Sequence, residues 1–197
     1  MTVDELYKEI EIELVNIEQT INELNSLLKD SQERKPTTRE ITSAGAFLAQ
    51  FYSGIENILK RIYKFHKVML PKGNLWHVEL FKRFQSPSYK SLPTLFDESF
   101  ASRLAPYRKF WHVFFHGYGF QLDWNRLKQG IEEGGEVFEM FKNKIYHYLE
   151  KLKSKSWYIT ASYIKYFRVS LYYLSAPISV TKKIYTLNKY LKILTEK

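Results

Sequence analysis

Apolar residues recur along most of the chain at steps of three and four, which places them on one side of an α-helix. The first series predicts a long helix packed in coiled-coil fashion on a neighbour: Val3, Tyr7, Ile10, Leu14, Ile17, Ile21, Leu24 and Leu28. Pro36 then predicts a turn, and Thr37 with Glu40 has the capping-box pattern that begins a second long helix. We expect that helix to end near Met69, before Pro71.

The same periodicity predicts three further helices. Their expected ranges are His77 to Phe84, Phe96 or Ser99 to Phe115, and Trp124 to Lys151. Gly117 and Gly119 predict a break between the last two. The chain is therefore expected to be all-α, an up-and-down bundle of four or five helices. Such a bundle does not by itself indicate a function.

Charge divides the chain into two parts. Residues 1–152 contain 21 Lys and Arg against 20 Asp and Glu, whereas residues 153–197 contain nine bases and a single acid, Glu196. We expect a helical bundle over 1–152 and a basic, aromatic-rich extension over 153–197. β-Branched and aromatic residues in the extension favour strands, although Lys182 to Leu194 fits a helix equally well.

Composition excludes several kinds of chemistry. The chain has no cysteine, which excludes disulfides, Cys-ligated metals and thiol catalysis, and fits a reducing, cytoplasmic location. The first fifteen residues are acidic, unlike a secretory signal, and no apolar run is long enough to span a membrane. Gly134-Gly135 lacks the Lys-Ser/Thr of a phosphate-binding loop. No cofactor is expected.

Arg108, His112 and His116 follow one another at four-residue steps, which aligns a guanidinium and two imidazoles along one helical stripe. These groups suit metal-free RNA cleavage, in which a base and an acid move protons and a cation stabilises the charge on phosphorus. The same four-residue spacing also fits a structural interpretation, in which these residues form a row of polar side chains between two packed helices. Two histidines without a third ligand nearby make a metal site the weaker interpretation, so no metal is expected.

The segment His116-Gly-Tyr118 resembles the end of the Arg-x4-His-x-Tyr signature of HEPN-domain ribonuclease toxins. It is most similar to the HepT-like branch, which occurs with MntA-type nucleotidyltransferase antitoxins. Three further segments resemble that branch in the same order: Phe51 to Ile62, Leu70 to His77 and Tyr118 to Asp123. The resemblance covers roughly residues 1–152.

The resemblance implies a helical homodimer whose signature helices face each other across a metal-independent RNA-cleaving groove. It implies that His116 is the catalytic histidine and that Tyr118 is the residue to which the antitoxin transfers AMP. The signature arginine would stand at position 111, which here is Trp111, and a second arginine common in the branch is replaced by Phe115. Activity retained through His116 would then need help from His112 or from Arg108.

Two classes of function follow. The first is an endoribonuclease of a toxin–antitoxin system, with activity impaired by the loss of the arginine. The second is an inactive HEPN bundle that binds RNA or a nucleotidyltransferase without cleavage. Candidate RNA contacts are Lys109, Lys165 and Arg168. The basic extension also leaves a third, peripheral membrane role open.

Overall fold

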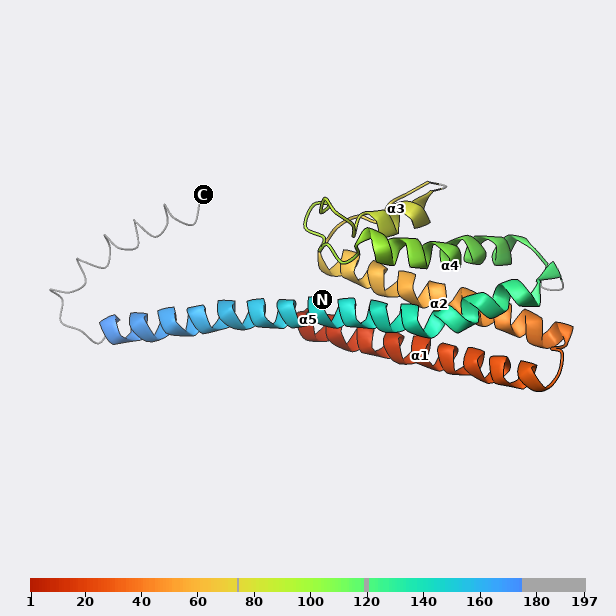
Figure 1. Ribbon diagram of the computed structural model, residues 1–197. Helices are drawn as coiled ribbons and strands as arrows, with labels where there is room; N and C mark the ends of the chain where they lie inside the picture. Colours follow the sequence, from red (N-terminus) through yellow and green to blue (C-terminus); the bar gives the residue numbers. More distant parts are fainter. Residues whose placement is uncertain (74, 119–120, 175–197) are drawn as a thin grey trace. The chain divides into compact units, whose positions relative to one another are not determined.

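The computed structural model describes residues 1–73, 75–118 and 121–174, and for residues 155–174 it describes the backbone only. Within these ranges the chain forms five helices and no strand (Figure 1), namely α1 (Val3–Glu33), α2 (Thr38–Phe65), α3 (Trp76–Lys82), α4 (Glu98–His116) and α5 (Trp124–Leu174). Residues 1–150 form one unit and residues 151–197 a second. In the first unit the long helices alternate in direction, so the expected all-α, up-and-down bundle is confirmed.

Capping boxes begin both of the first two helices. At the start of α2 the Thr37 hydroxyl accepts a hydrogen bond from Glu40 N, and the Thr37 amide donates to the Glu40 carboxylate, as the sequence predicts. Thr2 and Glu5 form the same arrangement at the start of α1. α2 ends at Phe65, earlier than expected, because the backbone of Lys67 turns into the left-handed region with a φ of 55°.

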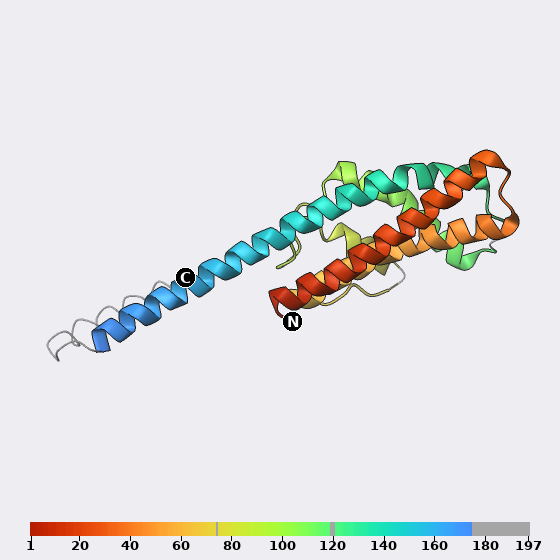
Figure 2. The ribbon, with the colours of Figure 1, turned by 90° about the horizontal axis from the view of Figure 1, so that it is seen from below.

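α1 and α2 pack along the predicted apolar series and lie side by side in both views (Figures 1 and 2). The buried residues of α1 are Leu6, Ile10, Leu14, Ile17, Ile21 and Leu24. The series is therefore correct at its centre, while Val3, Tyr7 and Leu28 at its ends are only half-buried. A Cβ on Gly54 of α2 would lie 2.5 Å from Ile17 Cγ1, so the absence of a side chain there permits the close approach.

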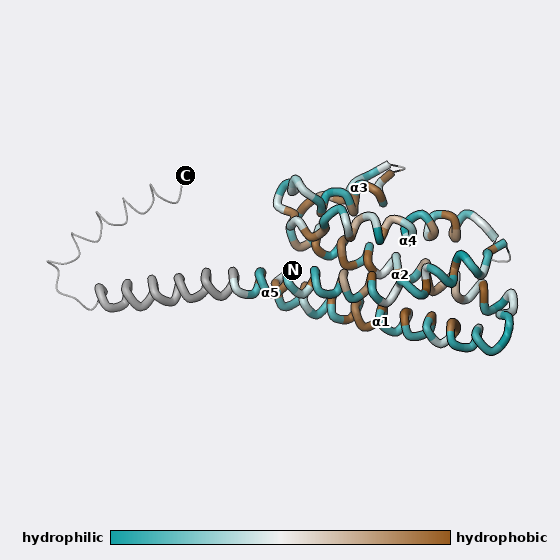
Figure 3. Tube along the Cα trace, in the orientation of Figure 1, coloured by the Kyte–Doolittle hydropathy of each residue, from teal (hydrophilic) through white to brown (hydrophobic). Residues whose placement is uncertain are grey.

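A cluster of phenylalanines holds α4 in the bundle. Phe81 of α3 stacks on Phe96 with ring centroids 4.5 Å apart, and Phe96 stacks on Phe100 of α4 at 5.0 Å. Phe141 of α5 contacts both Phe96 and Phe100. Figure 3 shows that hydrophobic and hydrophilic positions alternate along each helix of this unit, which is the pattern expected when one side of a helix faces a core.

α5 begins at Trp124 as expected but continues to Leu174 instead of ending at Lys151. The preference for strands after residue 153 is therefore wrong as far as Leu174. No proline or glycine occurs between Gly135 and Pro177, so no residue in that interval interrupts the helical hydrogen bonding. The segment Lys182 to Leu194 lies outside the described residues. No helix in the described part of the chain is sufficiently long and apolar to cross a membrane.

Candidate active site

α4 carries the side chains predicted to take part in cleavage, Arg108, His112 and His116, in its C-terminal half. Asp97 caps the helix, with its carboxylate accepting a hydrogen bond from Phe100 N at 2.7 Å. The helix ends at His116, and Gly117 follows in an extended conformation with φ −115° and ψ −178°. The bounds are thus within two residues of those expected, and the predicted break at Gly117 is confirmed.

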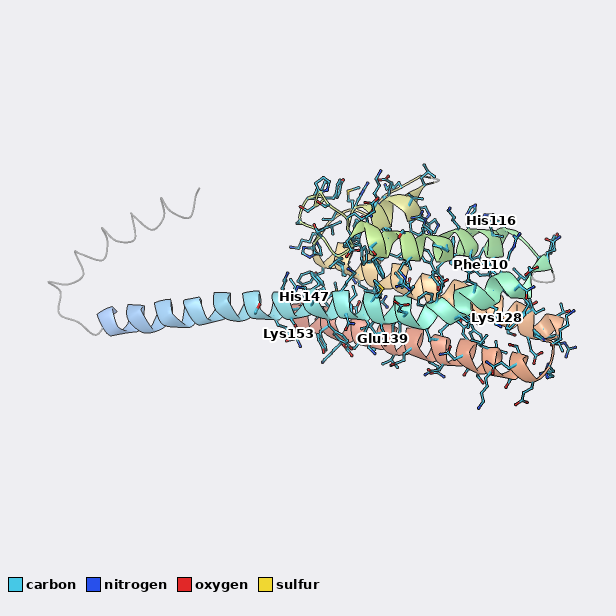
Figure 4. All side chains as sticks on the ribbon, viewed as in Figure 1. Phe110, His116, Lys128, Glu139, His147 and Lys153 are labelled. Carbon is cyan, nitrogen blue, oxygen red and sulfur yellow. The ribbon has the colours of Figure 1, made fainter. Side chains whose placement is uncertain are left out.

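His112 and His116 are both exposed on this last part of α4. Figure 4 labels His116 at the end of the helix. The ring centroids of the two histidines are 4.3 Å apart. His116 Nδ1 lies 2.7 Å from the backbone oxygen of His112. Because a carbonyl oxygen only accepts hydrogen bonds, Nδ1 must carry the proton, and in the neutral ring Nε2 is then the proton acceptor. The predicted alignment of these two histidines on one side of α4 is therefore confirmed.

Arg108, the third member of the predicted stripe, is half-buried one turn earlier and lies beside Tyr52 of α2. Burial raises the pKa of Tyr52 far above its ordinary value, and the positive charge of Arg108 opposes that shift. Among the described side chains, no hydrogen bond joins Arg108 to either histidine, and no carboxylate forms an ion pair with it. The structure therefore brings the two histidines together but directs Arg108 towards α2.

Trp111, where the resemblance implies the signature arginine, is anchored to α2. Its indole Nε1 donates a hydrogen bond to Ser53 Oγ at 2.8 Å. Its ring lies 4.5 Å from that of His77 and 4.9 Å from that of Phe115, measured between centroids. The indole thus fills the space between α2, α3 and α4 and brings no charge to it.

Beside Trp111 lies a carboxylate–imidazole pair, Glu56 and His77, that no motif in the sequence indicates. Glu56 of α2 is the only buried charged residue in the described part of the chain. Its Oε1 is 2.7 Å from His77 Nδ1, and its Oε2 is 3.6 Å from Lys60 Nζ. Although no motif marks this pair, the sequence holds one indication of it. Glu56 stands among the apolar residues of α2, where burial of an unpaired charge would cost free energy. His66 is another histidine used within the bundle, with Nε2 2.9 Å from the Tyr148 hydroxyl.

The remaining predicted residues are spread over different parts of the chain. Tyr118 follows α4 and is 69% exposed. Lys109 is exposed and lines a cavity of about 510 Å³ between α4 and α5, together with Phe110, Arg126 and Glu133. Lys165 and Arg168 lie in the stretch of α5 for which only the backbone is described. No group of three or more His, Asp or Glu residues within the described ranges is arranged to hold a metal ion.

Comparison with known proteins identifies the family. A family model described as "HepT-like protein" matches residues 43–152, more than half of the chain. The matched segment contains most of α2 and all of α3 and α4, including the two histidines, Trp111 and the Glu56–His77 pair. No curated protein and no solved structure gives a significant match. The chain therefore belongs to the family of HepT-like proteins.

Proposed function

We propose that this protein is a metal-independent endoribonuclease of the toxin type, with activity reduced by the replacement of its signature arginine. The observation that supports this proposal most directly is the exposed His116, whose Nδ1–H donates to its own helix and whose Nε2 is left as a proton acceptor. Membership of the HepT-like family supports the same interpretation.

In the proposed reaction, His116 Nε2 removes the proton of a ribose 2′-hydroxyl. The 2′-oxygen then attacks the adjacent phosphorus, and the bond from phosphorus to the 5′-oxygen breaks. His112, whose ring lies beside that of His116, is the proposed acid that returns a proton to the departing 5′-oxygen. The products are a 2′,3′-cyclic phosphate and a 5′-hydroxyl end.

The weak point of this reaction is stabilisation of the negative charge that develops on the phosphoryl oxygens. Trp111 supplies no cation, and its indole donor is already bound to Ser53. Arg108 is the guanidinium nearest to the histidines along α4, but it is half-buried against α2. Loss of one preorganised charge-stabilising donor lowers a rate on the order of 100- to 1000-fold. We therefore propose slow cleavage in which Arg108, from the same chain or from a second copy, partly replaces the missing cation.

The partners follow from the same proposal. We infer that RNA is the substrate, that a second copy forms a homodimer and that an MntA-like nucleotidyltransferase is the antitoxin, acting in the cytoplasm. Tyr118 would accept AMP, and its exposure is compatible with access by such an enzyme. The bundle over residues 1–152 would carry the site, while Lys165, Arg168 and the other bases of 153–197 would add affinity for RNA.

A second candidate function is binding without cleavage. The uncharged rings of Trp111 and Phe115, at positions where the family resemblance implies arginines, favour an inactive bundle that binds RNA or the nucleotidyltransferase. Cleavage and binding make different predictions for His116, because only cleavage requires its proton transfer.

The test is incubation of the purified full chain with total RNA in EDTA, followed by mapping of the new ends. Slow cleavage that leaves 5′-hydroxyl ends is expected, and His116→Ala should abolish it. His147→Ala is the matched control, since His147 is an exposed histidine of α5 and should tolerate the change. Cleavage that proceeds equally in the His116 variant would show that the residue is not catalytic, and RNA binding with no cleavage would favour the second candidate.

A further inference from the structure

Four rings contact one another in sequence across α3 and α4, and we call them the aromatic strip: Trp76, His77, Trp111 and Phe115. The centroids of successive rings are 3.5, 4.5 and 4.9 Å apart. The strip begins among half-buried side chains and ends at Phe115, which is 58% exposed. Because the other three rings of the strip are half-buried, Phe115 is the ring that offers an apolar surface to a ligand.

Polar contacts at the inner end hold the strip in place. Trp111 is fixed by its hydrogen bond to Ser53 Oγ, and His77 is fixed by Glu56, a carboxylate with only 3% side-chain exposure. The rings that support Phe115 are therefore oriented before any ligand arrives. Preorganisation of this kind lowers the entropy lost on binding.

The helix that carries the outer rings of the strip has almost no acid that would repel a polyanion. Residues 99–122, which include nearly all of α4, contain no Asp or Glu. Of their three bases, Arg103 pairs with Glu136 of α5, Arg108 lies beside Tyr52, and Lys109 lines the cavity between α4 and α5. At the other end, Lys60 Nζ lies 4.9 Å from the centre of the Trp76 ring. Aromatic faces set among basic side chains are the combination with which proteins bind single-stranded nucleic acid, because the rings stack on bases and the cations attract phosphates.

We propose that the aromatic strip binds an unpaired nucleobase, which stacks on the exposed ring of Phe115, one residue from His116, the proposed catalytic base. This inference rests on the proposed function for the nature of the ligand, and it narrows the substrate to single-stranded RNA. A base within a duplex is stacked on both faces and cannot lie on the strip. At position 115, where the family resemblance implies an arginine, contact of an aromatic ring with a base thus takes the place of contact of a cation with a phosphate.

The test compares two exposed apolar residues on α4. Phe115→Ala removes the outer ring of the strip, and Val113→Ala, at a residue with 61% exposure, is the matched control. Both are made in the His116→Ala background, so that the probe is not cut. Binding of a fluorescent twelve-nucleotide oligoadenylate RNA is measured by anisotropy in EDTA. Loss of a stacked base should weaken binding by about 5- to 100-fold for Phe115→Ala, whereas Val113→Ala should leave it within about twofold.

Two further probes separate stacking from attraction of charge. Inorganic polyphosphate and a twelve-base-pair RNA duplex carry phosphates but offer no free base, so Phe115→Ala should not alter binding of either. The proposal is overturned if Phe115→Ala weakens binding of polyphosphate as much as binding of oligoadenylate. It is also overturned if Phe115→Ala leaves the affinity for oligoadenylate unchanged. A loss accompanied by dissociation of an oligomer, absent in Val113→Ala, would also overturn it and assign Phe115 to a protein interface. Binding is measured without cleavage, so the two proposals can fail separately. If the protein binds oligoadenylate through Phe115 but does not cut RNA, the proposed nuclease activity is rejected and the proposed nucleobase site is retained.

Discussion

Trp111 of α4 donates a hydrogen bond from its indole Nε1 to Ser53 Oγ of α2 across 2.8 Å. The position at which the family resemblance implies a catalytic cation is therefore occupied by a side chain that joins two helices. Its contact with the His77 ring extends this role to α3. A change at position 111 should thus affect both catalysis and stability, and the two effects can be measured separately.

Trp111→Arg should increase the rate of RNA cleavage by about 100- to 1000-fold, because it returns a charge-stabilising donor to α4. The same change should lower the melting temperature, since the hydrogen bond to Ser53 and the ring contacts are lost. The rate is measured in EDTA and the melting temperature by circular dichroism. Trp111→Phe keeps an aromatic ring without a charge and should show no increase in rate. If the arginine variant is no faster than this control, the missing cation is not the limiting defect.

Glu56→Ala should destabilise the fold by about 3–5 kcal/mol, because the buried carboxylate is a partner of His77 and lies near Lys60. Urea unfolding gives this free energy. Glu23→Ala, at an exposed position of α1, is the control and should change stability by less than about 0.5 kcal/mol. Combination of Glu56→Ala with His77→Ala should cost less than the sum of the single changes. If the two losses of unfolding free energy add fully in the double variant, the contact between Glu56 and His77 does not contribute to stability.

Asp97 should make the stability of the bundle depend on pH on the acid side. A hydrogen bond from Lys144 and another from Phe100 N lower the pKa of Asp97 below its ordinary value of 3.8. A carboxyl group with a lowered pKa in the folded state stabilises the fold above its ordinary pKa, and this contribution is lost as the pH falls through the folded value. Asp97→Asn, which retains a capping side chain, should therefore melt at a lower temperature at neutral pH. The difference from the parent should shrink below about pH 4, and a difference that is constant with pH would exclude the charge as its cause.

Truncation after Leu152 should leave a folded bundle, because the buried core extends no further than Leu149 among the described side chains. It should remove most of the electrostatic affinity for RNA, since nine of the 30 basic residues and only one acid follow that point. Circular dichroism and RNA binding over a series of salt concentrations provide the measurement. Aggregation or a large fall in melting temperature would instead indicate that the extension packs on apolar surface. Undiminished affinity with the same salt dependence would show that the extension does not contribute to binding.

Local sequence patterns predict the start of a helix well where residues close together in the sequence determine it. The Thr37–Glu40 capping box and the start of α5 at Trp124 are both confirmed, because a cap depends on residues three positions apart. The ends of helices are predicted less well. α2 stops at Phe65 because Lys67 adopts a left-handed conformation, and α5 passes Lys151 because no residue interrupts it. Neither outcome is apparent from the periodicity of apolar residues.

For the site, the i, i+4 spacing predicts that His112 and His116 are neighbours, since both lie on one helix. The same spacing does not bring Arg108 to the histidines, because its half-buried side chain lies beside Tyr52 of α2. The pairing of Glu56 with His77 joins residues 21 positions apart on α2 and α3. Contacts of this kind depend on how helices pack, and one sequence without its fold does not specify them.

The hydrogen bond from His116 Nδ1 to the His112 carbonyl places the tautomer of the proposed base under the control of the final turn of α4. Helix ends open at far lower free energies than a buried core, and the extended backbone of Gly117 does not provide the left-handed closure that often protects such an end. Fraying of one turn would let the imidazole proton exchange between the two nitrogens. Catalysis that depends on this geometry should decline on warming before the bundle itself melts, so the temperature at which activity is lost would report the opening of a single helical turn.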